Sequence, residues 1–302
     1  MTKTVIIIAG PTAAGKTALA IELAKSLDTE IISADSRQCY REMNIGVARP
    51  SPAELATVKH YFIASHTIQS AVNAAGFEQY ALQIAEQLFK RHDTIVMVGG
   101  TGLYIKAFCE GLDVMPQVPA SVRTRIVEQY ENNGISWLQQ ELRTRDPLFF
   151  ETGEIENPHR LMRALEMVTH TGRSIREFQS NKRTTRPFNI IKIGIAPPKN
   201  ILHQQITRRV HQMMSDGLLE EVRSLVPYRH LGPLQTVGYK EIFAYLDRQT
   251  TLDEAVENII IHTRQYAKRQ LTWFRKDPEI TWVEPANADV MQVITNLRKS
   301  SK

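Results

Sequence analysis

The sequence has few cysteines and no long hydrophobic run. Cys39 and Cys109 are its only two cysteines, too few for a disulfide framework or a four-cysteine zinc site. Its longest apolar run has the length of a strand, far below the ~20 residues that cross a membrane. A strand begins at Val5 and a glycine-rich loop follows it directly, which leaves no room for a signal peptide. We therefore expect a cytoplasmic protein that does not contact a membrane.

The charge balance is moderately basic. Of the 302 residues, 42% are hydrophobic, which is enough to bury the core of one large domain or of two. A formal net charge of +5 favours a polyanionic partner without requiring one. Whether the partner is a polyanion must therefore be judged from the distribution of the charges along the chain.

The stretch IIIAGPTAAGKTALA (6–20) is typical of a phosphate loop between a strand and a helix. A β-branched run precedes the pattern G-x-x-x-x-G-K-[ST], and leucines follow at helical spacing. Backbone N–H groups and the helix N-terminus attract an anion, Lys16 adds a positive charge, and the Thr17 hydroxyl can hold Mg²⁺. The pattern predicts a phosphate site, as in nucleotide- and ATP-binding proteins, at Gly10, Pro11, Thr12, Ala13, Ala14, Gly15, Lys16 and Thr17.

Two further strand ends should lie beside this loop. The strand Glu30–Ala34 runs into Asp35, which is a general base, an indirect Mg²⁺ holder or a solvated turn residue. The strand Thr94–Val98 runs into the sequence GGTG (99–102), where an ATPase would carry an aspartate that holds Mg²⁺. A motor-type or regulatory NTPase is therefore disfavoured. Thr101 can cap the next helix or donate its hydroxyl to a phosphate oxygen.

Strand candidates that alternate with helical segments predict an α/β fold, a P-loop NTPase-like parallel sheet flanked by helices. The fourth strand, Ile190–Ala196, comes long after the third. Between them the sequence predicts amphipathic helices at 122–130, 135–143, 157–170 and 174–181. We therefore predict a core of residues 1–112 and 187–302, and a helical insertion domain of residues 113–186 with proline-containing hinges.

A long helix predicted up to Lys276 carries only basic charges from Asn258 onward. Such an acid-free stretch favours contact with a phosphate backbone, with Arg264, Lys268, Arg269 and Arg275 as candidates. The aromatic residues Tyr266, Trp273 and Phe274 share the opposite, apolar side. We expect them to pack against the sheet rather than to stack on bases.

Two other segments supply basic candidates. In a helix predicted to begin at Ile206 and to continue to Glu221, either Arg208 or Arg209 clamps phosphates, or both face solvent. In the insertion, Asn157 caps a helix whose apolar face leaves Arg160 and Arg163 exposed. Acidic residues are interspersed there, so the insertion fits nucleic acid less well than the long helix does.

Six motifs together resemble the tRNA dimethylallyltransferases, also called isopentenyl-pyrophosphate tRNA transferases. The resemblance covers nearly the whole chain in the family's order and spacing. The motifs are GPTAAGKT (10–17), ISADSRQCY (32–40), VGGTGLYIKA (98–107), NPHRLMRALE (157–166), TVGYKEI (236–242) and YAKRQLTWFRK (266–276).

The resemblance implies that the loop holds the pyrophosphate of dimethylallyl pyrophosphate, with Mg²⁺. The acceptor would be the exocyclic amine of the adenine 3′ of the anticodon in tRNA. Some members carry a carboxyl-terminal zinc finger, but the sequence has no Cys/His spacing for one up to Lys302, so zinc is not expected. Family members are generally monomers.

The resemblance also implies roles for individual residues. Asp35 is similar to the general base, Thr101 to a hydroxyl at the reacting centre, and Lys16, Thr17 and Arg209 to pyrophosphate or metal contacts. The residues that would meet tRNA, including the anticodon stem-loop, are Asp35, Ser36, Arg37, Gln38, Thr101, Arg123, His159, Arg160, Leu161, Met162, Arg163, Lys240, Arg264, Lys268, Arg269 and Arg275.

The sequence leaves three alternative functions open. An adenylate isopentenyltransferase would transfer the same group to a free nucleotide, without needing the insertion or the acid-free helix. A small-molecule kinase would use the phosphate loop for ATP and Asp35 as its base. A non-catalytic RNA-binding module would keep its cellular role without Asp35.

Overall fold

The computed structural model describes residues 3–180 and 182–284. They form two compact units that divide after Glu110 and after Thr184: a core unit on either side of the division in sequence and an insertion unit of Gly111–Thr184. These boundaries lie within two residues of the boundaries predicted for the core and the insertion. Of the predicted core, residues 285–302 lie outside the described part.

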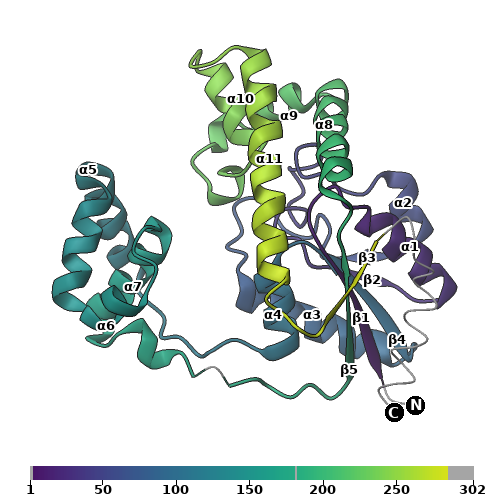
Figure 1. Cartoon of the computed structure of the whole chain (residues 1–302), viewed down its shortest axis with the longest axis horizontal. Coiled ribbons are helices and arrows are strands. Elements are labelled where there is room, and N and C mark those ends of the chain that lie inside the picture. The colour runs from purple at the N-terminus through teal and green to yellow at the C-terminus, as the bar shows by residue number, and fades with distance from the viewer. Residues whose placement is uncertain (1–2, 181, 285–302) are drawn as a thin grey trace. The chain divides into compact units, whose positions relative to one another are not determined.

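The core unit contains a six-stranded sheet in which every pair of neighbours is parallel, as predicted (Figure 1). Its spatial order is β3-β2-β4-β1-β5-β6. The strands are β1 (Thr4–Ala9), β2 (Ile31–Ser33), β3 (His60–Tyr61), β4 (Thr94–Gly99), β5 (Asn189–Ile195) and β6 (Ile280–Val283). The two short edge strands β3 and β6 were not expected from the sequence.

Helices cover both faces of the sheet, because successive side chains of a strand point to opposite faces. Val5, Ile7 and Ala9 of β1 belong to one apolar core, while Ile6 and Ile8 belong to another. The helices of this unit are α1 (Lys16–Ser26), α2 (Pro52–Thr57), α3 (Ala74–Phe89), α4 (Gly102–Glu110), α8 (Lys199–Ser215), α9 (Leu218–Ser224), α10 (Tyr239–Leu246) and α11 (Leu252–Phe274).

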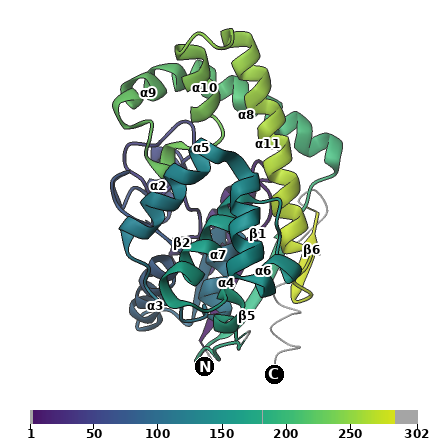
Figure 2. The same ribbon diagram turned by 90° about the vertical axis from the view of Figure 1, so that its left-hand side faces the viewer.

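The long helix α11 packs against α8, α10 and α4 and thereby connects distant parts of the core unit (Figure 2). The helix predicted around Ile206 begins earlier, at Lys199, and ends at Ser215. The segment after Gly217, predicted to continue it, forms the separate helix α9. Among the described residues, no helix combines the length and apolarity needed to cross a membrane.

The insertion unit is helical and has its own apolar core. It consists of α5 (Ala120–Arg145), α6 (Pro147–Thr152), α7 (Pro158–Thr171) and the short 3₁₀ helix η1 (Ile175–Phe178). The two helices predicted at 122–130 and 135–143 are joined into α5 across a kink at Gly134. Asn157 caps α7 as predicted, with Oδ1 accepting hydrogen bonds from the backbone of His159 and Arg160.

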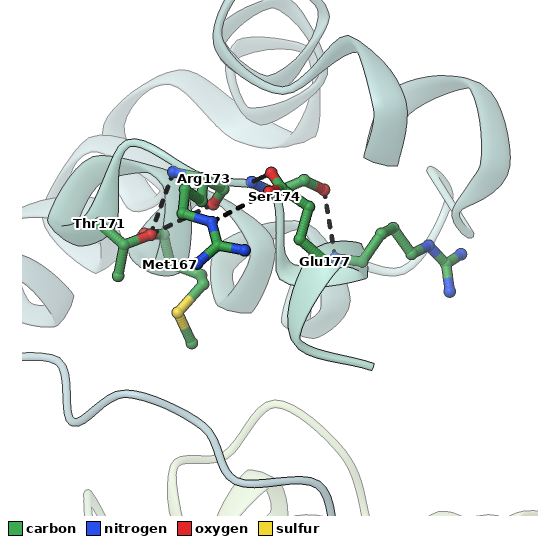
Figure 3. Close-up of polar contacts among 6 residues, drawn as sticks. Met167, Thr171, Arg173, Ser174 and Glu177 are labelled. Carbon is green, nitrogen blue, oxygen red and sulfur yellow. Dashed lines mark hydrogen bonds and ion pairs between the residues drawn. The ribbon is translucent and has the colours of Figure 1, made fainter. Parts of the chain in front are cut away.

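The helix predicted at 174–181 is largely absent, because local side-chain bonds favour a tight turn (Figure 3). Ser174 and Glu177 form a capping box around η1, which ends at Phe178. Glu177 also accepts a hydrogen bond of 3.0 Å from Nε of Arg173. The predicted end of this helix at residue 181 lies outside the described residues.

A buried lysine fastens the edge strand β6 to the sheet. Nζ of Lys192 on β5 lies 2.8 Å from carboxylate oxygens of Asp277 and Glu279, which flank the turn before β6. Burial opposes the charge of Lys192, but the hydrogen bonds to Asp277 and Glu279 raise its pKa above the ordinary value. Lys192 therefore stays protonated at neutral pH.

We predict that Lys192→Met lowers the free energy of unfolding by about 1–3 kcal/mol, because two partly exposed carboxylates lose their cation. Urea denaturation measures this change. The matched control is Arg223→Ala, which removes an exposed ion pair with Glu220 on α9 and should cost less than about 0.5 kcal/mol. Equal effects of the two substitutions would contradict the role of Lys192.

Candidate active site at the carboxyl edge of the sheet

The phosphate loop faces a cavity of about 290 Å³ at the carboxyl ends of the strands. The loop joins β1 to α1, as the motif predicts, and Nζ of Lys16 donates a 2.6 Å hydrogen bond to the carbonyl of Pro11. The predicted residues Asp35, Arg37, Gln38 and Arg209 line the same cavity. The fold thus brings most of the predicted small-molecule site together.

The charge of Lys16 is set by its surroundings. Burial lowers the pKa of Lys16 to about 8, the carboxylate of Asp35 opposes this shift, and the guanidinium of Arg209 adds to it. At neutral pH most Lys16 ammonium groups are therefore charged. A bound anion would favour the protonated form further.

Asp35 and Thr101 are joined through the turn that follows β2. Oδ1 of Asp35 accepts hydrogen bonds from the backbone N–H groups of Arg37 (2.8 Å) and Gln38 (3.1 Å). Oγ1 of Thr101 accepts one from the N–H of Ser36 at 3.0 Å. The aspartate is therefore held by a turn, while its second carboxylate oxygen accepts no hydrogen bond from the described residues.

Gln270 of α11 is a buried residue whose role the sequence did not reveal. Its Oε1 accepts a 2.8 Å hydrogen bond from the N–H of Thr12, and its Nε2 donates one of 2.8 Å to the carbonyl of Gly100. A Cβ atom at Gly100 would lie 2.3 Å from that Nε2. A larger residue at position 100 would therefore displace the amide that connects α11 to the phosphate loop.

The two arginine candidates on α8 differ in position. Arg209 lines the cavity and its Nη1 lies 3.4 Å from Oγ1 of Thr12. Burial lowers the pKa of Arg209, but a guanidinium remains charged in a protein. Arg208 is exposed on an adjoining open groove. The structure therefore supports Arg209 rather than Arg208 as the cation next to the phosphate loop.

The prediction that the aromatic residues of α11 pack against the sheet is correct for one of three. Phe274 is 2% exposed, but Tyr266 and Trp273 are 37% and 41% exposed. Tyr266 lines the cavity, and burial of its hydroxyl together with the charge of Asp35 raises its pKa to about 12. Tyr266 is thus a site residue that periodicity assigned to the core.

Most basic candidates of the core unit are exposed. Lys268 and Arg269 on α11 and Arg275 directly after it face solvent. Lys240 is exposed as well and borders a groove beside Tyr266. Arg264 differs, because it is half-buried and its Nη2 donates a 3.0 Å hydrogen bond to Oγ1 of Thr207 on α8. Of the predicted basic residues on α11, Arg264 therefore contributes partly to the packing of α11 against α8.

In the insertion unit, a buried carboxylate holds two of the predicted arginines. Glu166 is 2% exposed and pairs with Arg123 at 2.9 Å and with Arg163 at 3.1 Å. The three groups carry a net charge of +1 on a surface where both guanidiniums remain accessible. Arg160 pairs with Glu154, and its neighbour His159 is exposed.

Two predicted RNA contacts of the insertion, Leu161 and Met162, have buried side chains. Leu161 and Met162 are buried in the core of that unit. The apolar face of α7 packs against α5, because this unit has no sheet to cover it. Their side chains therefore stabilise the unit, and an RNA contact of these two residues stays a prediction.

Two further charged residues, Glu221 and Arg49, hold the loop that borders the cavity. Glu221 of α9 accepts hydrogen bonds from the N–H groups of residues 44–46 and from the hydroxyl of Tyr239. Nη2 of Arg49 donates to three carbonyl oxygens of residues 40–43. Neither residue belongs to a local motif, so only the folded chain reveals that they hold the loop beside the cavity.

Fold and site together define a phosphate-loop α/β protein with an aspartate at the neighbouring strand end and a helical insertion. Residues 38–277 match the model of the IPP transferase family. The chain belongs to this family.

Relatives match along almost the whole chain. A tRNA dimethylallyltransferase of Christiangramia forsetii is 46% identical over 284 residues, which cover 94% of each chain. One from Bacteroides thetaiotaomicron, tRNA dimethylallyltransferase 1, is 43% identical and covers 93% of this chain and 92% of its own.

Solved structures agree with this assignment. A full-length tRNA isopentenylpyrophosphate transferase from Bacillus halodurans aligns with a TM-score of 0.71 and 33% identity, covering 98% of this chain and 95% of its own. A eukaryotic dimethylallyltransferase acting on tRNA aligns with a TM-score of 0.77 and 25% identity, covering 99% of this chain and 78% of its own.

We predict that binding of inorganic pyrophosphate weakens as the pH rises through about 8, because Lys16 then loses its proton in the free protein. Calorimetric titration between about pH 6.5 and 9.5 measures this against Lys16→Arg, whose charge persists throughout. The comparison cancels the ionisation of the ligand itself. A constant ratio of the two affinities over this range would contradict the predicted titration of Lys16.

Proposed function

We propose that the protein transfers a dimethylallyl group from dimethylallyl pyrophosphate to the exocyclic amine of an adenine in tRNA, releasing pyrophosphate. The adenine is the one 3′ of the anticodon. The observation that carries this proposal is a single cavity lined both by the phosphate loop and by Asp35. Family membership and the names of the relatives support the same reaction.

The reaction forms a bond between the adenine nitrogen and the allylic carbon and breaks the bond between that carbon and the pyrophosphate oxygen. Pyrophosphate leaves with the bonding electron pair, and the amine proton passes to the free carboxylate oxygen of Asp35. An adenine amine is a weak nucleophile, so stabilising the leaving group contributes most. Lys16, Arg209 and the loop N–H groups supply that stabilisation.

The residues present fit a Mg²⁺ ion that binds through pyrophosphate. Mg²⁺ commonly keeps one or two protein oxygens and takes the rest from phosphates and water. The half-buried Thr17 hydroxyl lines the cavity and suits this pattern, and no group of three metal-binding side chains occurs among the described residues. Bound there, Mg²⁺ would neutralise charge on the departing pyrophosphate.

We assign the RNA contacts to both units. In the core, the strand-end residues 35–38 and Thr101 would surround the adenine, with Lys240, Lys268, Arg269 and Arg275 on the neighbouring phosphates. In the insertion, Arg123, His159, Arg160 and Arg163 would contact the anticodon stem-loop. The base must leave its stack to reach the cavity, at a cost of a few kcal/mol.

The alternatives are less well supported. A free-nucleotide transferase would not need the basic surface of α11 or that of the insertion. A kinase is disfavoured by the names of the relatives, which describe transfer to tRNA. A non-catalytic RNA-binding module would have no use for the phosphate loop beside Asp35. We further propose that the protein acts as a cytoplasmic monomer.

We predict that Asp35→Asn lowers the turnover number of transfer by about 100- to 10,000-fold, the range for loss of a general base. The asparagine keeps an Oδ1 acceptor for the N–H groups of Arg37 and Gln38, so the turn survives. Asp35→Ala removes both the base and the acceptor of the turn, so a comparison of the two variants separates these two roles. The assay combines Mg²⁺, labelled dimethylallyl pyrophosphate and unmodified tRNA, and parallel reactions contain ATP or AMP in place of the tRNA.

Several outcomes of this assay would count against the proposal. Normal transfer by Asp35→Asn would exclude Asp35 as the base. If the wild type labels no tRNA and instead turns over ATP, the protein is a kinase and the proposed function fails. Label on free AMP alone would indicate the nucleotide-specific reaction.

We predict that Lys268→Ala weakens tRNA binding and reduces the slope of log affinity against log salt by about 0.7 to 0.9, because one phosphate contact is lost. The control is Lys25→Ala, an equally exposed lysine at the end of α1. Fluorescence anisotropy at several salt concentrations gives both slopes. An unchanged slope for Lys268→Ala would remove this side of α11 from the interface.

A further inference from the structure

Residues 35–49 lie between β2 and α2 and belong to none of the helices or strands. One end is the turn at residues 35–38 that holds the carboxylate of Asp35. The other end, at residues 46–48, lines the cavity. A segment without a helical or strand ladder needs other partners for its N–H and carbonyl groups. We call residues 35–49 the cavity loop.

The carboxylate of Glu221 on α9 holds the end of the cavity loop that borders the cavity. Its Oε2 accepts hydrogen bonds from the N–H groups of Asn44 (3.1 Å) and Ile45 (2.7 Å). Its Oε1 accepts one from the N–H of Gly46 (3.0 Å) and one from the hydroxyl of Tyr239 (2.6 Å). Four donors therefore converge on one side chain, which offers only acceptors when it is ionised.

Tyr239 of α10 supports the same end of the loop. The residue is fully buried, and a Cβ atom at Gly46 would lie 2.6 Å from its ring, so the loop backbone rests directly on the aromatic ring. Burial and the carboxylate of Glu221 raise the pKa of Tyr239, which keeps its hydroxyl protonated as a donor. Because α9 packs against α10 (Figure 2), the two side chains form one fixed anchor.

One side chain connects this anchored end of the loop to the turn that holds Asp35. Nε2 of Gln38 donates hydrogen bonds to the carbonyls of Val47 (3.2 Å) and Ala48 (2.9 Å). The backbone N–H of the same glutamine donates to Oδ1 of Asp35 at 3.1 Å. A shift of the anchored end therefore moves Gln38, and Gln38 moves the carboxylate of Asp35 with it.

Other contacts hold the first half of the cavity loop independently of Glu221. Nη2 of Arg49 donates to carbonyl oxygens of residues 40–43. The carbonyl of Gln38 accepts a 2.9 Å hydrogen bond from the N–H of Ala64. Without Glu221 the turn should therefore shift rather than unfold. The expected result is a misaligned Asp35, which is a smaller defect than the loss of its carboxylate.

We propose that Glu221 is a positioning residue for the transfer: it fixes the cavity loop and, through Gln38, sets the direction in which Asp35 presents its free carboxylate oxygen. This inference rests on the proposed function, in which that oxygen accepts the amine proton. A general base must lie within hydrogen-bond reach of the proton that it takes. Glu221 meets this requirement for Asp35 without touching the substrate itself.

The test compares Glu221→Gln with Glu220→Gln in the full chain. A glutamine has nearly the size of glutamate, but its NH₂ group would oppose two of the four donors whichever way the amide is turned. Glu220 is the exposed neighbour in the same first turn of α9, so both variants lose the same favourable interaction with the helix N-terminus. Glu221→Gln should lower the kcat of transfer about 10- to 100-fold, the effect of misplacing a reacting group by about 1 Å, and Glu220→Gln should not change it.

Binding of inorganic pyrophosphate separates a misplaced base from a damaged donor site. The hydrogen bonds of Glu221 go to residues 44–46 and to Tyr239 rather than to the phosphate loop. The Kd of pyrophosphate, measured by calorimetry, should therefore be the same in Glu221→Gln as in the wild type. A parallel loss of pyrophosphate affinity and kcat would indicate a general distortion of the cavity and overturn the proposal.

A double-mutant cycle tests the path through Gln38. Gln38→Met removes the amide that bonds to Val47 and Ala48 but keeps the length of the side chain and the backbone N–H. If Glu221 acts through Gln38, Glu221→Gln should lower kcat far less in the Gln38→Met protein than in the wild type, because one path cannot be lost twice. Multiplicative losses would mean that Glu221 does not act on Asp35 through Gln38.

Hydrogen exchange of the free protein gives a readout that does not depend on catalysis. In Glu221→Gln the N–H groups of residues 44–46 should exchange faster, because their acceptor is weakened. The N–H groups of Arg37 and Gln38, which bond to Asp35, should exchange faster as well. Faster exchange confined to residues 44–46 would show that the anchor acts only locally, and the proposal would be wrong.

The outcomes also distinguish this inference from the proposed function. If the wild type transfers the dimethylallyl group to tRNA and Glu221→Gln does so with the same kcat, Glu221 is not a positioning residue and the function stands. If the wild type transfers nothing, while exchange in Glu221→Gln rises both at residues 44–46 and at residues 37–38, the proposed function alone is refuted.

Discussion

The side-chain amide of Gln270 is the contact on which the site depends. It accepts a hydrogen bond from the phosphate loop at Thr12 and donates one to Gly100 at the end of β4. A buried amide with both ends paired is favourable, whereas either end left unpaired costs about 1–3 kcal/mol. The two hydrogen bonds therefore tie α11 to both the phosphate loop and the end of β4. The helix that carries the proposed RNA surface is fixed to the loop that binds the leaving group.

This connection also explains the missing aspartate at the end of β4. A Walker-type protein would place a carboxylate where this chain has Gly99 and Gly100. Here a Cβ atom at Gly100 would lie 2.3 Å from Nε2 of Gln270, so an acidic residue at this position would displace the amide from its hydrogen bonds. The site therefore has no protein carboxylate at this position to orient a hydrolytic water. Stabilisation of a leaving group is the chemistry that the remaining cations and N–H groups serve.

Much of the core site could be predicted because its parts are local. The phosphate loop, Asp35 after β2 and Thr101 after β4 each follow a strand within a few residues, and parallel strands bring their carboxyl ends to one edge. The sequence did not predict β3 and β6, because each is short and lies at an edge of the sheet. Each is a strand because it pairs with its neighbour, and not because of a pattern in its own sequence. Gln270 and Glu221 act on loops far away in sequence, so no local pattern marks them.

The errors on α11 and α7 have a shared physical origin. Helical periodicity identifies which residues lie on one side of a helix, but not how much of that side another element covers. On α11 the sheet and its loops cover Phe274 and leave Tyr266 and Trp273 partly open. On α7 the packing against α5 buries Leu161 and Met162. The apolar side of α7 is therefore buried in the insertion unit, whereas the edge of the apolar side of α11 is partly exposed.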